Sequence, residues 1–574
     1  MAQNTYRLPK VLILTTGADQ GRGTVSDGIV LALQSFNKLG VPVRLENREI
    51  LLHTEKLANY DILIIPTIKG YHDLPQKFSL TYMSDYELEN INNWVKNGGT
   101  LVSDINIGRN TLKGADRVVA NGELNSKNWK LSECFGVSLH ERNTFDWIVT
   151  DSNMHIWKSK ILSRKSKKIW QLIPKKAKNT VKVLANWQTN KGDIPAITLN
   201  KYGSGNAFLL PSFYILHPNT DGGLSNEKQI NDFYAFIYQT SIGKHKYDIR
   251  FSPWKNAHTS VYCQTFDDGG NMEQYQRIFD FINKNKLPTV FFVTPEIDKK
   301  IIDVLKQQKL ISIQGHSFNH PDFRKLNYFE TQNELLLNRQ FWQKNFSGFR
   351  FPYVSNSFWG LYSLNKLNFM YDTSIAANNM EFIRGSVVPY NIPIFKDDFF
   401  TTLDLIEISQ IYKSDWYFYQ KVLDKKPYTK IMQKHDAQLF KKYLIDYFEQ
   451  VTVANNGVMV YLGHPMYVGI SSTTLQALQD LINHLQQQDV WFASLNEVAE
   501  RWNIYQKLKV NITEKEKSVT IDFLTNKPLN DFTVCLKQEP KKIKNVKDYK
   551  VIEVNTNYCI VFDVKDKTKI EIIY

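Results

Sequence analysis

The stretch VYCQTFDDG (residues 261–269) joins an apolar run to two adjacent carboxylates, Asp267 and Asp268. A continuous apolar run that ends in polar residues is typical of a strand in a parallel sheet, where functional side chains gather at the carboxyl end. Two neighbouring carboxylates raise one another's pKa, and a nearby cation removes this cost. The stretch is also compatible with an exposed Asp-Asp-Gly turn, so it indicates a metal site only in combination with other motifs.

Further apolar runs between residues 250 and 502 end in polar residues in the same way, and helical patterns separate several of them. These runs are Thr289–Val293, Ile311–Ile313, Phe349–Phe351, Val458–Leu462 and Val490–Phe492. This alternation predicts a (β/α) barrel, in which catalytic groups lie at the carboxyl ends of the strands.

A histidine pair follows one of these runs in the stretch HSFNH (residues 316–320). Two imidazoles four residues apart can face one ion, although such a pair is more often surface or core. Together with Asp268, His316 and His320 form a set of two histidines and one carboxylate. Such a set leaves coordination positions open for water and substrate.

Three shorter motifs complete the pattern: RFPY (350–353), YDTS (371–374) and LGHP (462–465). The guanidinium of Arg350 can hold a carboxylate in one orientation. A histidine at a strand end, such as His464, can supply a proton near neutral pH. Each of these motifs is weak evidence by itself.

The order and spacing of these motifs resemble the polysaccharide deacetylases, carbohydrate esterase family 4, whose motifs read TFDD, HSxxH, RxPY and a late Leu-x-His. Residues 258–500 carry all four in the family order. The resemblance implies a (β/α)7-type deacetylase barrel over residues 249–503. It also implies a metal-dependent hydrolase that removes N-acetyl groups from amino sugars of a polysaccharide or glycan precursor.

The resemblance implies Asp268, His316 and His320 as metal ligands. Zn²⁺ is the default ion for this set, and Co²⁺, Mn²⁺ or Fe²⁺ would also fit. A divalent ion makes hydroxide available near neutral pH and polarises a carbonyl group.

The resemblance also implies the remaining roles. Asp267 would be the general base, oriented by Arg350, and the backbone N–H of Tyr353 would help to hold the oxyanion. His464 would be the general acid for the departing amine. Many family members carry an Asp-Trp motif further along the chain; here the YDTS stretch around Asp372 stands out instead, so Asp372 or another carboxylate tunes His464.

Residues 1–248 alternate strand and helix signals, which predicts a parallel, doubly wound, flavodoxin-like α/β domain. The order of elements resembles the class I glutamine amidotransferase-like fold, without the cysteine that catalytic members carry on a tight turn, so we expect no catalysis there. Residues 84–87 form a capping box, residues 196–210 read as a hairpin, and 226–242 as a closing helix. Gly21-Arg22-Gly23 is a plain turn rather than a phosphate loop.

Residues 504–574 contain short alternating segments and no helical pattern, which predicts a small β-sandwich that binds glycan or braces the barrel. The stretch 396–435, which includes Trp416, Tyr417, Phe418 and Tyr419, either binds substrate or covers the barrel. The four cysteines are scattered and predict neither a disulfide framework nor a cysteine metal site.

The formal charge of +14 favours anionic partners. The densest basic stretch, residues 158–178, reads as a solvated insertion, with contact to an anionic glycan or surface as the alternative. No nucleic-acid module and no membrane span are legible. We expect a cytoplasmic protein if the chain is complete, and an exported one if a leader was removed.

Two other functions remain open. One is deformylation or deacetylation of a small carrier-linked sugar. The other is a catalytically silent glycan-binding protein, which intact Asp267 and His464 argue against, because binding alone needs neither residue.

Overall fold

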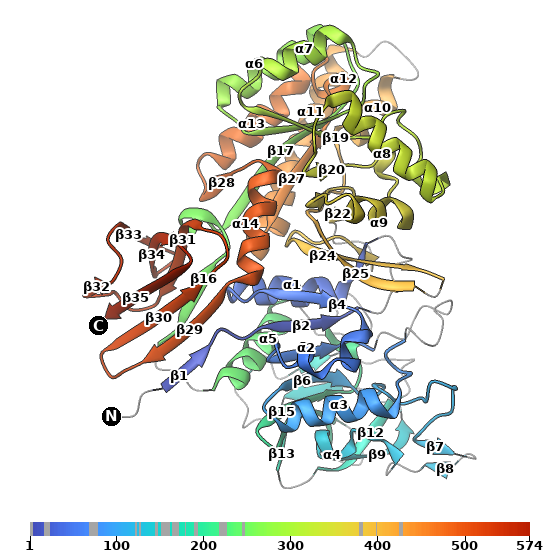
Figure 1. Cartoon of the computed structure of the whole chain (residues 1–574), viewed down its shortest axis with the longest axis vertical. Helices are drawn as coiled ribbons and strands as arrows, with labels where there is room; N and C mark the ends of the chain where they lie inside the picture. The colour runs from blue at the N-terminus through green and yellow to red at the C-terminus, as the bar shows by residue number, and fades with distance from the viewer. Residues whose placement is uncertain are drawn as a thin grey trace.

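A computed structural model shows the chain as a tall body with the two termini close together on one side (Figure 1). The structure describes residues 4–15, 23–67, 79–120, 123–124, 128–143, 147–150, 156, 161–163, 171–177, 180–188, 193–216, 227–243, 247–377, 383–397, 399–423 and 429–574. Two sequence predictions fall largely outside them: the turn at Gly21-Arg22-Gly23, of which only Gly23 is described, and the side chains of the basic stretch 158–178.

A curled parallel sheet forms the upper body, with β17 (Ser260–Asp267) in its middle. On one side of β17 the parallel neighbours follow one another as β18, β19, β20, β21 and β25, and on the other side lies β27. After β25 the chain continues directly into β26, and β26 pairs with β27, the other neighbour of β17. The bounds are β18 Thr289–Val293, β19 Ile311–Gly315, β20 Gly348–Phe349, β21 Tyr371–Asp372, β25 Phe399–Glu407, β26 Gln410–Ile411 and β27 Val458–Gly463.

Three more strands lie at the margins of this sheet: β22 (Ala376–Ala377) beside β26, β24 (Tyr390–Lys396) antiparallel to β25, and β28 (Val490–Phe492) beside β17. Each predicted strand of this region is present within a few residues. The predicted α/β fold of this region is therefore confirmed; among the described strands the sheet is curled, and its strand pairings do not close the predicted (β/α)7-type barrel.

Helices cover the outside of the curled sheet (Figure 1). Helix α6 is typical: its buried Tyr275, Ile278, Phe279 and Ile282 recur at three- and four-residue spacing, which gives one apolar face. Asn271 caps its amino end in a capping box. The bounds are α6 Met272–Asn285, α7 Lys299–Gln307, α8 Tyr328–Trp342, α9 Phe358–Lys366, α10 Asp415–Leu423, α11 Lys430–Tyr447, α12 Pro465–Val468, α13 Ser472–Leu485 and α14 Leu495–Lys507.

The N-terminal sheet is parallel over five strands, in the order β15-β6-β5-β2-β4. Their bounds are β2 Val11–Leu14, β4 Val43–Glu46, β5 Ile62–Ile65, β6 Thr100–Asp104 and β15 Gly205–Leu210. Alternate residues of β2 enter different cores, because successive side chains point to opposite faces: Val11 and Ile13 on one side, Leu12 and Leu14 on the other.

Helices close both faces of this sheet. The bounds are α1 Asp27–Lys38, α2 Thr54–Leu57, α3 Asp85–Lys96, α4 Ser132–Phe135 and α5 Glu227–Ile242. Ser84 and Glu87 form the predicted capping box, and β14 (Ile194–Tyr202) and β15 form the predicted hairpin.

Antiparallel strands extend the N-terminal sheet beyond β14 through β13 (Val181–Gln188), β10 (Trp147–Thr150) and β11 (Ile161–Ser163). The doubly wound part of the prediction therefore holds for the parallel strands. The flavodoxin-like architecture of the domain as a whole is not confirmed.

The C-terminal region consists of two antiparallel sheets, each completed by a strand from elsewhere in the chain. One has the order β1-β29-β30-β35-β32 and the other β16-β31-β34-β33. Strands β1 (Asn4–Arg7) and β16 (Ile249–Ser252) lie outside the predicted boundaries 504–574. The remaining bounds are β29 Lys509–Glu514, β30 Ser518–Leu524, β31 Leu529–Leu536, β32 Lys542–Lys544, β33 Tyr549–Val554, β34 Asn557–Val564 and β35 Lys567–Ile573.

Two of the four cysteines form a disulfide, which the sequence did not lead us to expect. Cys535 on β31 lies directly opposite Cys559 on β34 and is bonded to it. The sequence predicts no disulfide framework, and the spacing of the cysteines does not reveal this single bond, because the bond depends on strand register. Cys134 and Cys263 are free and buried.

Hydrogen bonds and one continuous apolar core join the three parts of the chain. The side-chain amide of Asn37 on α1 donates to the carbonyls of Asn455 and Asn456, 3.2 and 2.8 Å away. The Tyr505 hydroxyl on α14 donates to the carbonyl of Gly40 at 2.7 Å. Within the part of the chain that the structure describes, no helix has both the length and the apolar character needed to cross a bilayer.

Candidate active site

Three side chains that are distant in the sequence meet at the carboxyl ends of β17 and β19. One ligand atom each of Asp268, His316 and His320 lies within 4.8 Å of the other two. His316 is buried, whereas Asp268 and His320 are partly accessible. The spacing suits a single divalent ion, which the sequence motifs predict at this place.

The imidazole of His316 is oriented by the backbone. Its Nδ1 lies 2.7 Å from the carbonyl oxygen of Arg350, so Nδ1 carries the proton and Nε2 keeps its lone pair. Such a bond behind a histidine is the usual second partner of a metal ligand. The donor set therefore fits a divalent ion chemically as well as geometrically.

The loop between the two histidines is held by helix α8. The Glu334 carboxylate accepts hydrogen bonds from the backbone N–H groups of Phe318 and Asn319, at 3.0 and 2.9 Å, and from the Asn319 side-chain amide at 2.6 Å. The Asn338 amide donates to the carbonyl of Ser317 at 2.5 Å. Sequence reasoning missed Glu334 and Asn338, because no motif links them to the histidines.

His320 occupies an unusual backbone position, with φ at 52°. Its N–H donates to the Ser317 hydroxyl at 3.1 Å, and its ring packs edge-on against Tyr353. Burial and the neighbouring His316 lower the pKa of His320 from its usual value, which keeps the imidazole neutral and able to bind an ion.

Asp268 is fixed by the strand next to its own. The hydroxyl of Thr294, just past β18, donates to the Oδ2 atom of Asp268 at 2.7 Å, and the Thr294 backbone N–H lies 3.3 Å from the same atom. This leaves the other carboxylate oxygen to face the histidines.

Asp267 is buried and paired with Arg350. A guanidinium nitrogen of Arg350 donates to Oδ1 of Asp267 at 2.7 Å. Burial would raise the pKa of Asp267, but the charge of Arg350, its hydrogen bond and the neighbouring His464 outweigh burial, and the pKa is lowered overall. The carboxylate therefore stays ionised and ready to accept a proton.

Arg350 is itself fully buried, and its other contacts fix its plane. Its Nε donates to the carbonyl of Thr373 at 3.1 Å, and the guanidinium lies 4.4 Å from the ring centre of Phe292. The orienting role that the sequence predicts for Arg350 agrees with this geometry.

His464 follows β27 and is held at two points by Asp415. Its Nδ1 lies 2.8 Å from Oδ1 of Asp415, and its backbone N–H donates to Oδ2 at 2.6 Å. Its Nε2 lies 4.0 Å from Oδ2 of Asp267. Burial would lower the pKa of His464, but Asp415, Asp267 and Asp268 raise it overall.

Asp415, and not Asp372, is therefore the carboxylate that contacts His464. Asp372 points instead into the interior, where it accepts from the hydroxyl and the N–H of Ser374, at 2.8 and 3.2 Å. It lies beside Glu407 of the neighbouring strand, and burial raises the pKa of both carboxyls. Of the two possibilities that the sequence left open, Asp372 or another carboxylate, the contacts of His464 are with another one, Asp415, so the candidate role of Asp372 beside His464 is corrected.

The signal for Asp415 was present in the sequence. Asp415-Trp416 is an Asp-Trp pair further along the chain from the RFPY motif, which is where the family pattern expects it. The sequence motifs instead draw attention to the YDTS stretch, and they leave residues 396–435 as either a substrate-binding segment or a cover of the barrel. In fact Asp415 opens helix α10, and the helix positions it against His464.

The aromatic residues of this stretch are divided between surface and core. Tyr419 is fully buried and Phe418 packs against Phe440 and Tyr443, so these two cover the barrel. Trp416 is 48% exposed and directly follows Asp415. The stretch therefore braces the barrel and also presents an accessible ring next to the partner of His464.

Tyr353 lies at the rim of the site. Its φ of 56° bends the chain immediately after Pro352, and its side chain is 67% exposed. The Ser374 hydroxyl holds this turn from behind by accepting from the N–H of Phe351 at 2.8 Å. The same hydroxyl donates to Asp372, so Asp372 supports the RFPY turn rather than His464.

Comparison with known proteins gives two family matches. Residues 255–371 match the polysaccharide deacetylase model, and residues 34–241 match the β-galactosidase trimerisation domain. A curated relative, the peptidoglycan-N-acetylglucosamine deacetylase of Bacillus cereus, is 29% identical over 94 residues, which are 16% of this chain and 33% of the relative. The matched segment thus spans about a third of that relative's length.

Two solved structures are similar to parts of this chain. A family 4 carbohydrate esterase from Streptomyces lividans, in complex with acetate, is 14% identical, with a TM-score of 0.26 over 42% of this chain and 94% of its own. The β-galactosidase of a Rahnella species is 15% identical, with a TM-score of 0.29 over 43% of this chain and 34% of its own.

The predicted polysaccharide deacetylase region is thus confirmed in its coarse form by the family match. The amidotransferase-like prediction for the first domain is not supported, since the matching model there is a β-galactosidase trimerisation domain. Alternating strands and helices occur in many α/β families, so the order of elements could not distinguish between them.

Proposed function

We propose that this chain is a metal-dependent hydrolase that removes N-acetyl groups from amino sugars of a polysaccharide or glycan precursor. The observation that carries the proposal is the meeting of Asp268, His316 and His320 beside two oriented proton-transfer groups, Asp267 and His464. The polysaccharide deacetylase match over residues 255–371 and the named activity of the Bacillus cereus relative support it.

Asp268, His316 and His320 would hold the metal, most simply Zn²⁺, which when bound would supply Lewis-acid chemistry near neutral pH. The low pKa of Asp267 keeps its carboxylate ionised, so it can accept a proton as general base. Arg350 fixes the direction in which that carboxylate faces.

His464 is the general acid in this proposal. Its raised pKa favours the protonated imidazole, and its Nδ1 is occupied by Asp415, so Nε2 is the atom that delivers a proton to the departing amine. The distance of 4.0 Å between Nε2 and Oδ2 of Asp267 places base and acid side by side at one site, where both can reach the same reacting group. The N–H of Tyr353 would stabilise the oxyanion.

Two further points belong to the same proposal. Trp416 would offer its exposed ring to a sugar face beside the site. The disulfide between Cys535 and Cys559 supports an oxidising location such as the cell exterior, since cytosolic thiols are kept reduced.

The first prediction tests the catalytic roles. Asp267→Asn should reduce acetate release from chito-oligosaccharides by roughly 10²–10⁴-fold, because the general base is lost, and leave the bound metal nearly unchanged. His316→Ala should lose both acetate release and the bound metal. Acetate release and elemental analysis of the purified protein measure the two quantities.

The exposed Asp303→Asn on α7 serves as the control and should retain activity and metal. Near-normal activity in Asp267→Asn would contradict the assignment of the base. A wild-type protein that binds the oligosaccharide but releases no acetate would favour the silent glycan-binding alternative. Activity on small sugars alone would favour a carrier-linked substrate.

A further inference from the structure

A second cleft lies at the junction of the N-terminal sheet, helix α5 and the C-terminal sheets. Its volume is about 890 Å³, which is within the usual range of ligand sites. Strand β16 lines it, and Ser252 of that strand contacts His258, at the amino end of β17. Asp267 lies at the other end of this eight-residue strand, roughly 25 Å away, so the cleft is separate from the candidate active site.

One wall of the cleft is a single face of three antiparallel strands. Lys182 pairs with Leu199, and Lys201 pairs with Asn206. Because residues two apart on a strand share a face, Leu199 and Lys201 point to one side together with their partners Lys182 and Asn206, and all four line the cleft. Lys182 and Lys201 are exposed there.

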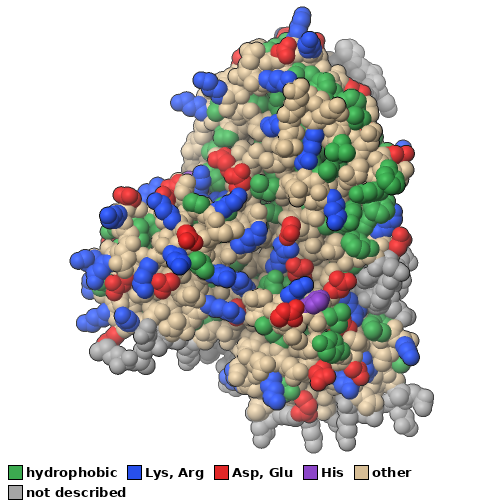
Figure 2. All heavy atoms as spheres, in the orientation of Figure 1, with side chains coloured by type: hydrophobic (Ala, Val, Ile, Leu, Met, Phe, Trp, Pro, Cys, Tyr) green, Lys and Arg blue, Asp and Glu red, His purple; other side chains and the backbone are tan. Residues whose placement is uncertain are grey.

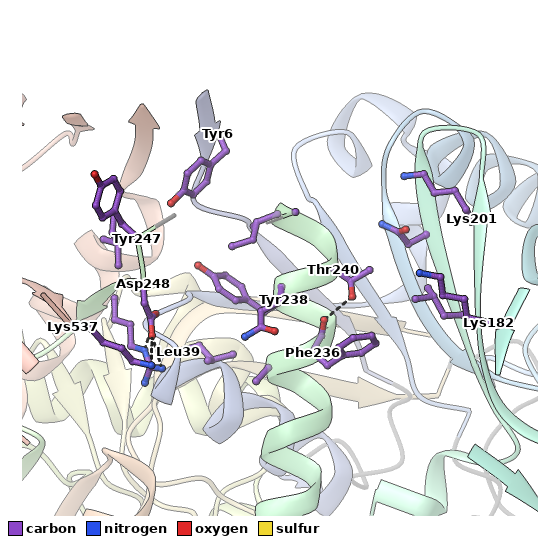
Figure 3. A pocket seen from close by; sticks show the side chains of 18 of the residues that line it. Tyr6, Leu39, Lys182, Lys201, Phe236, Tyr238, Thr240, Tyr247, Asp248 and Lys537 are labelled. Atoms are coloured by element: carbon purple, nitrogen blue, oxygen red, sulfur yellow. Dashed lines mark hydrogen bonds and ion pairs between the residues drawn. The ribbon is translucent and has the colours of Figure 1, made fainter. Parts of the chain in front are cut away.

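The opposite wall comes from β1, β16 and the residue after β31. Figure 3 shows Tyr6, Tyr247, Asp248 and Lys537 on this side and the two lysines on the other. Asp248 pairs with Arg250 at 3.2 Å and with Lys537 at 3.1 Å. The described residues that line the cleft thus include four cationic side chains and one carboxylate. This excess of positive charge favours an anionic ligand.

Helix α5 forms the floor between the two walls (Figure 3). It contributes the rings of Phe236 and Tyr238 and the polar side chains of Gln239 and Thr240. Burial raises the pKa of Tyr238 to about 12, so the phenol stays neutral and can donate a hydrogen bond. Rings combined with amide and hydroxyl groups suit a ligand that has apolar faces and many hydroxyls.

We propose that this cleft binds an acidic oligosaccharide, with sugar rings against Tyr6 and Tyr238 and the anionic groups towards Lys182 and Lys201. The cationic walls alone would suit any anion, and the aromatic floor alone any apolar group. Their combination with side-chain amides is the chemistry of a charged sugar. The site would hold a polymer at a distance from the catalytic residues and does not depend on the proposed reaction.

Calorimetric titration of the full chain tests the proposal with two probes, a hyaluronan hexasaccharide and hexa-N-acetylchitohexaose, the fully acetylated and therefore neutral chitohexaose. The hyaluronan hexasaccharide should bind, and the double variant Lys182→Glu/Lys201→Glu should weaken its binding at least about tenfold, because two attractive charges become repulsive. The affinity for chitohexaose and the rate of acetate release should not change, since the active site is untouched.

Lys299→Glu, an exposed lysine on α7, is the matched control and should bind the acidic hexasaccharide as the wild type does. If charge reversal disturbs folding, the milder pair Lys182→Ala/Lys201→Ala replaces it and should also weaken the binding of the hyaluronan hexasaccharide. The proposal is overturned if the wild type does not bind the acidic hexasaccharide, if the double variants bind it unchanged, or if Lys299→Glu weakens it equally, which would indicate attraction to the overall positive charge.

Discussion

At the scale of single residues, the contact between His464 and Asp415 decides how the proposed acid behaves. Burial alone would favour the neutral imidazole, yet the carboxylates around it raise its pKa, with Asp415 contributing most through charge and hydrogen bonding. A protonated acid is therefore present below the raised pKa and is lost as the pH rises through it.

The second prediction follows from the direction of this pKa shift. Asp415→Asn removes the charge that raises the pKa of His464, so the alkaline limb of the pH–kcat profile should move to lower pH. Activity at the optimum should also decrease, by up to about 10²-fold, because the imidazole is less well oriented. Initial rates of acetate release across pH measure both effects.

Asp372→Asn is the informative comparison, because its side chain does not contact His464. It should leave the alkaline limb in place even if it lowers stability or kcat through the RFPY turn. If the alkaline limb moves in Asp372→Asn and stays in place in Asp415→Asn, then Asp372 and not Asp415 raises the pKa of His464.

At the scale of elements, helix α8 supports the loop that carries the proposed metal ligands. Glu334 accepts from two of the three backbone N–H groups between the two histidines, so the helix sets where His320 stands relative to His316. The positive φ values of Ser317 and His320 make this loop unfavourable without such support.

The third prediction tests the support. Glu334→Gln keeps the size of the side chain but removes the charge that binds two N–H groups, so metal affinity should decrease roughly 10- to 100-fold. Competition with a chelator measures it. Asp303→Asn removes a carboxylate from the neighbouring helix α7 and should not change metal affinity; equal losses in both variants would mean that net charge, rather than the loop, is responsible.

The outer elements also carry a surface of aromatic rings. Hydrophobic side chains gather over α8 and α9 on the right of the view in Figure 2. Tyr328, Trp359, Tyr362 and Phe399 pack there in edge-on contacts, and Lys396 lies 4.5 Å from the ring centre of Trp359. These rings stabilise one another and fix the β24–β25 hairpin against α9.

At the scale of the whole molecule, the three parts share one core. Buried residues from the N-terminal sheet, the curled sheet and the C-terminal sheets form a single cluster, and β1 and β16 pair with C-terminal strands. The parts therefore cannot separate without exposing a large apolar area.

The fourth prediction is that thermal unfolding gives one calorimetric transition. Asn37→Ala should lower the free energy of unfolding by about 1–3 kcal/mol, because two carbonyl groups across the junction lose their donor. Asn93→Ala, an exposed residue of α3, should have little effect. Two well-separated transitions, or equal effects of the two substitutions, would contradict a shared core.

The sequence by itself determined six strands of the curled sheet, the capping box at residues 84–87 and the residues of the proposed metal site, because each depends on a local pattern: apolar runs, cap residues, or short motifs at strand ends. Asp268, His316 and His320 could be predicted together because parallel strands bring their carboxyl ends to one edge.

Only the tertiary structure decided which carboxylate meets His464, that Glu334 holds the histidine loop, that Cys535 faces Cys559, and that β1 completes a sheet formed by residues 509–573. Each of these depends on register or on packing between segments hundreds or tens of residues apart. Local patterns specify what an element is, whereas the burial of shared surfaces specifies which elements become neighbours.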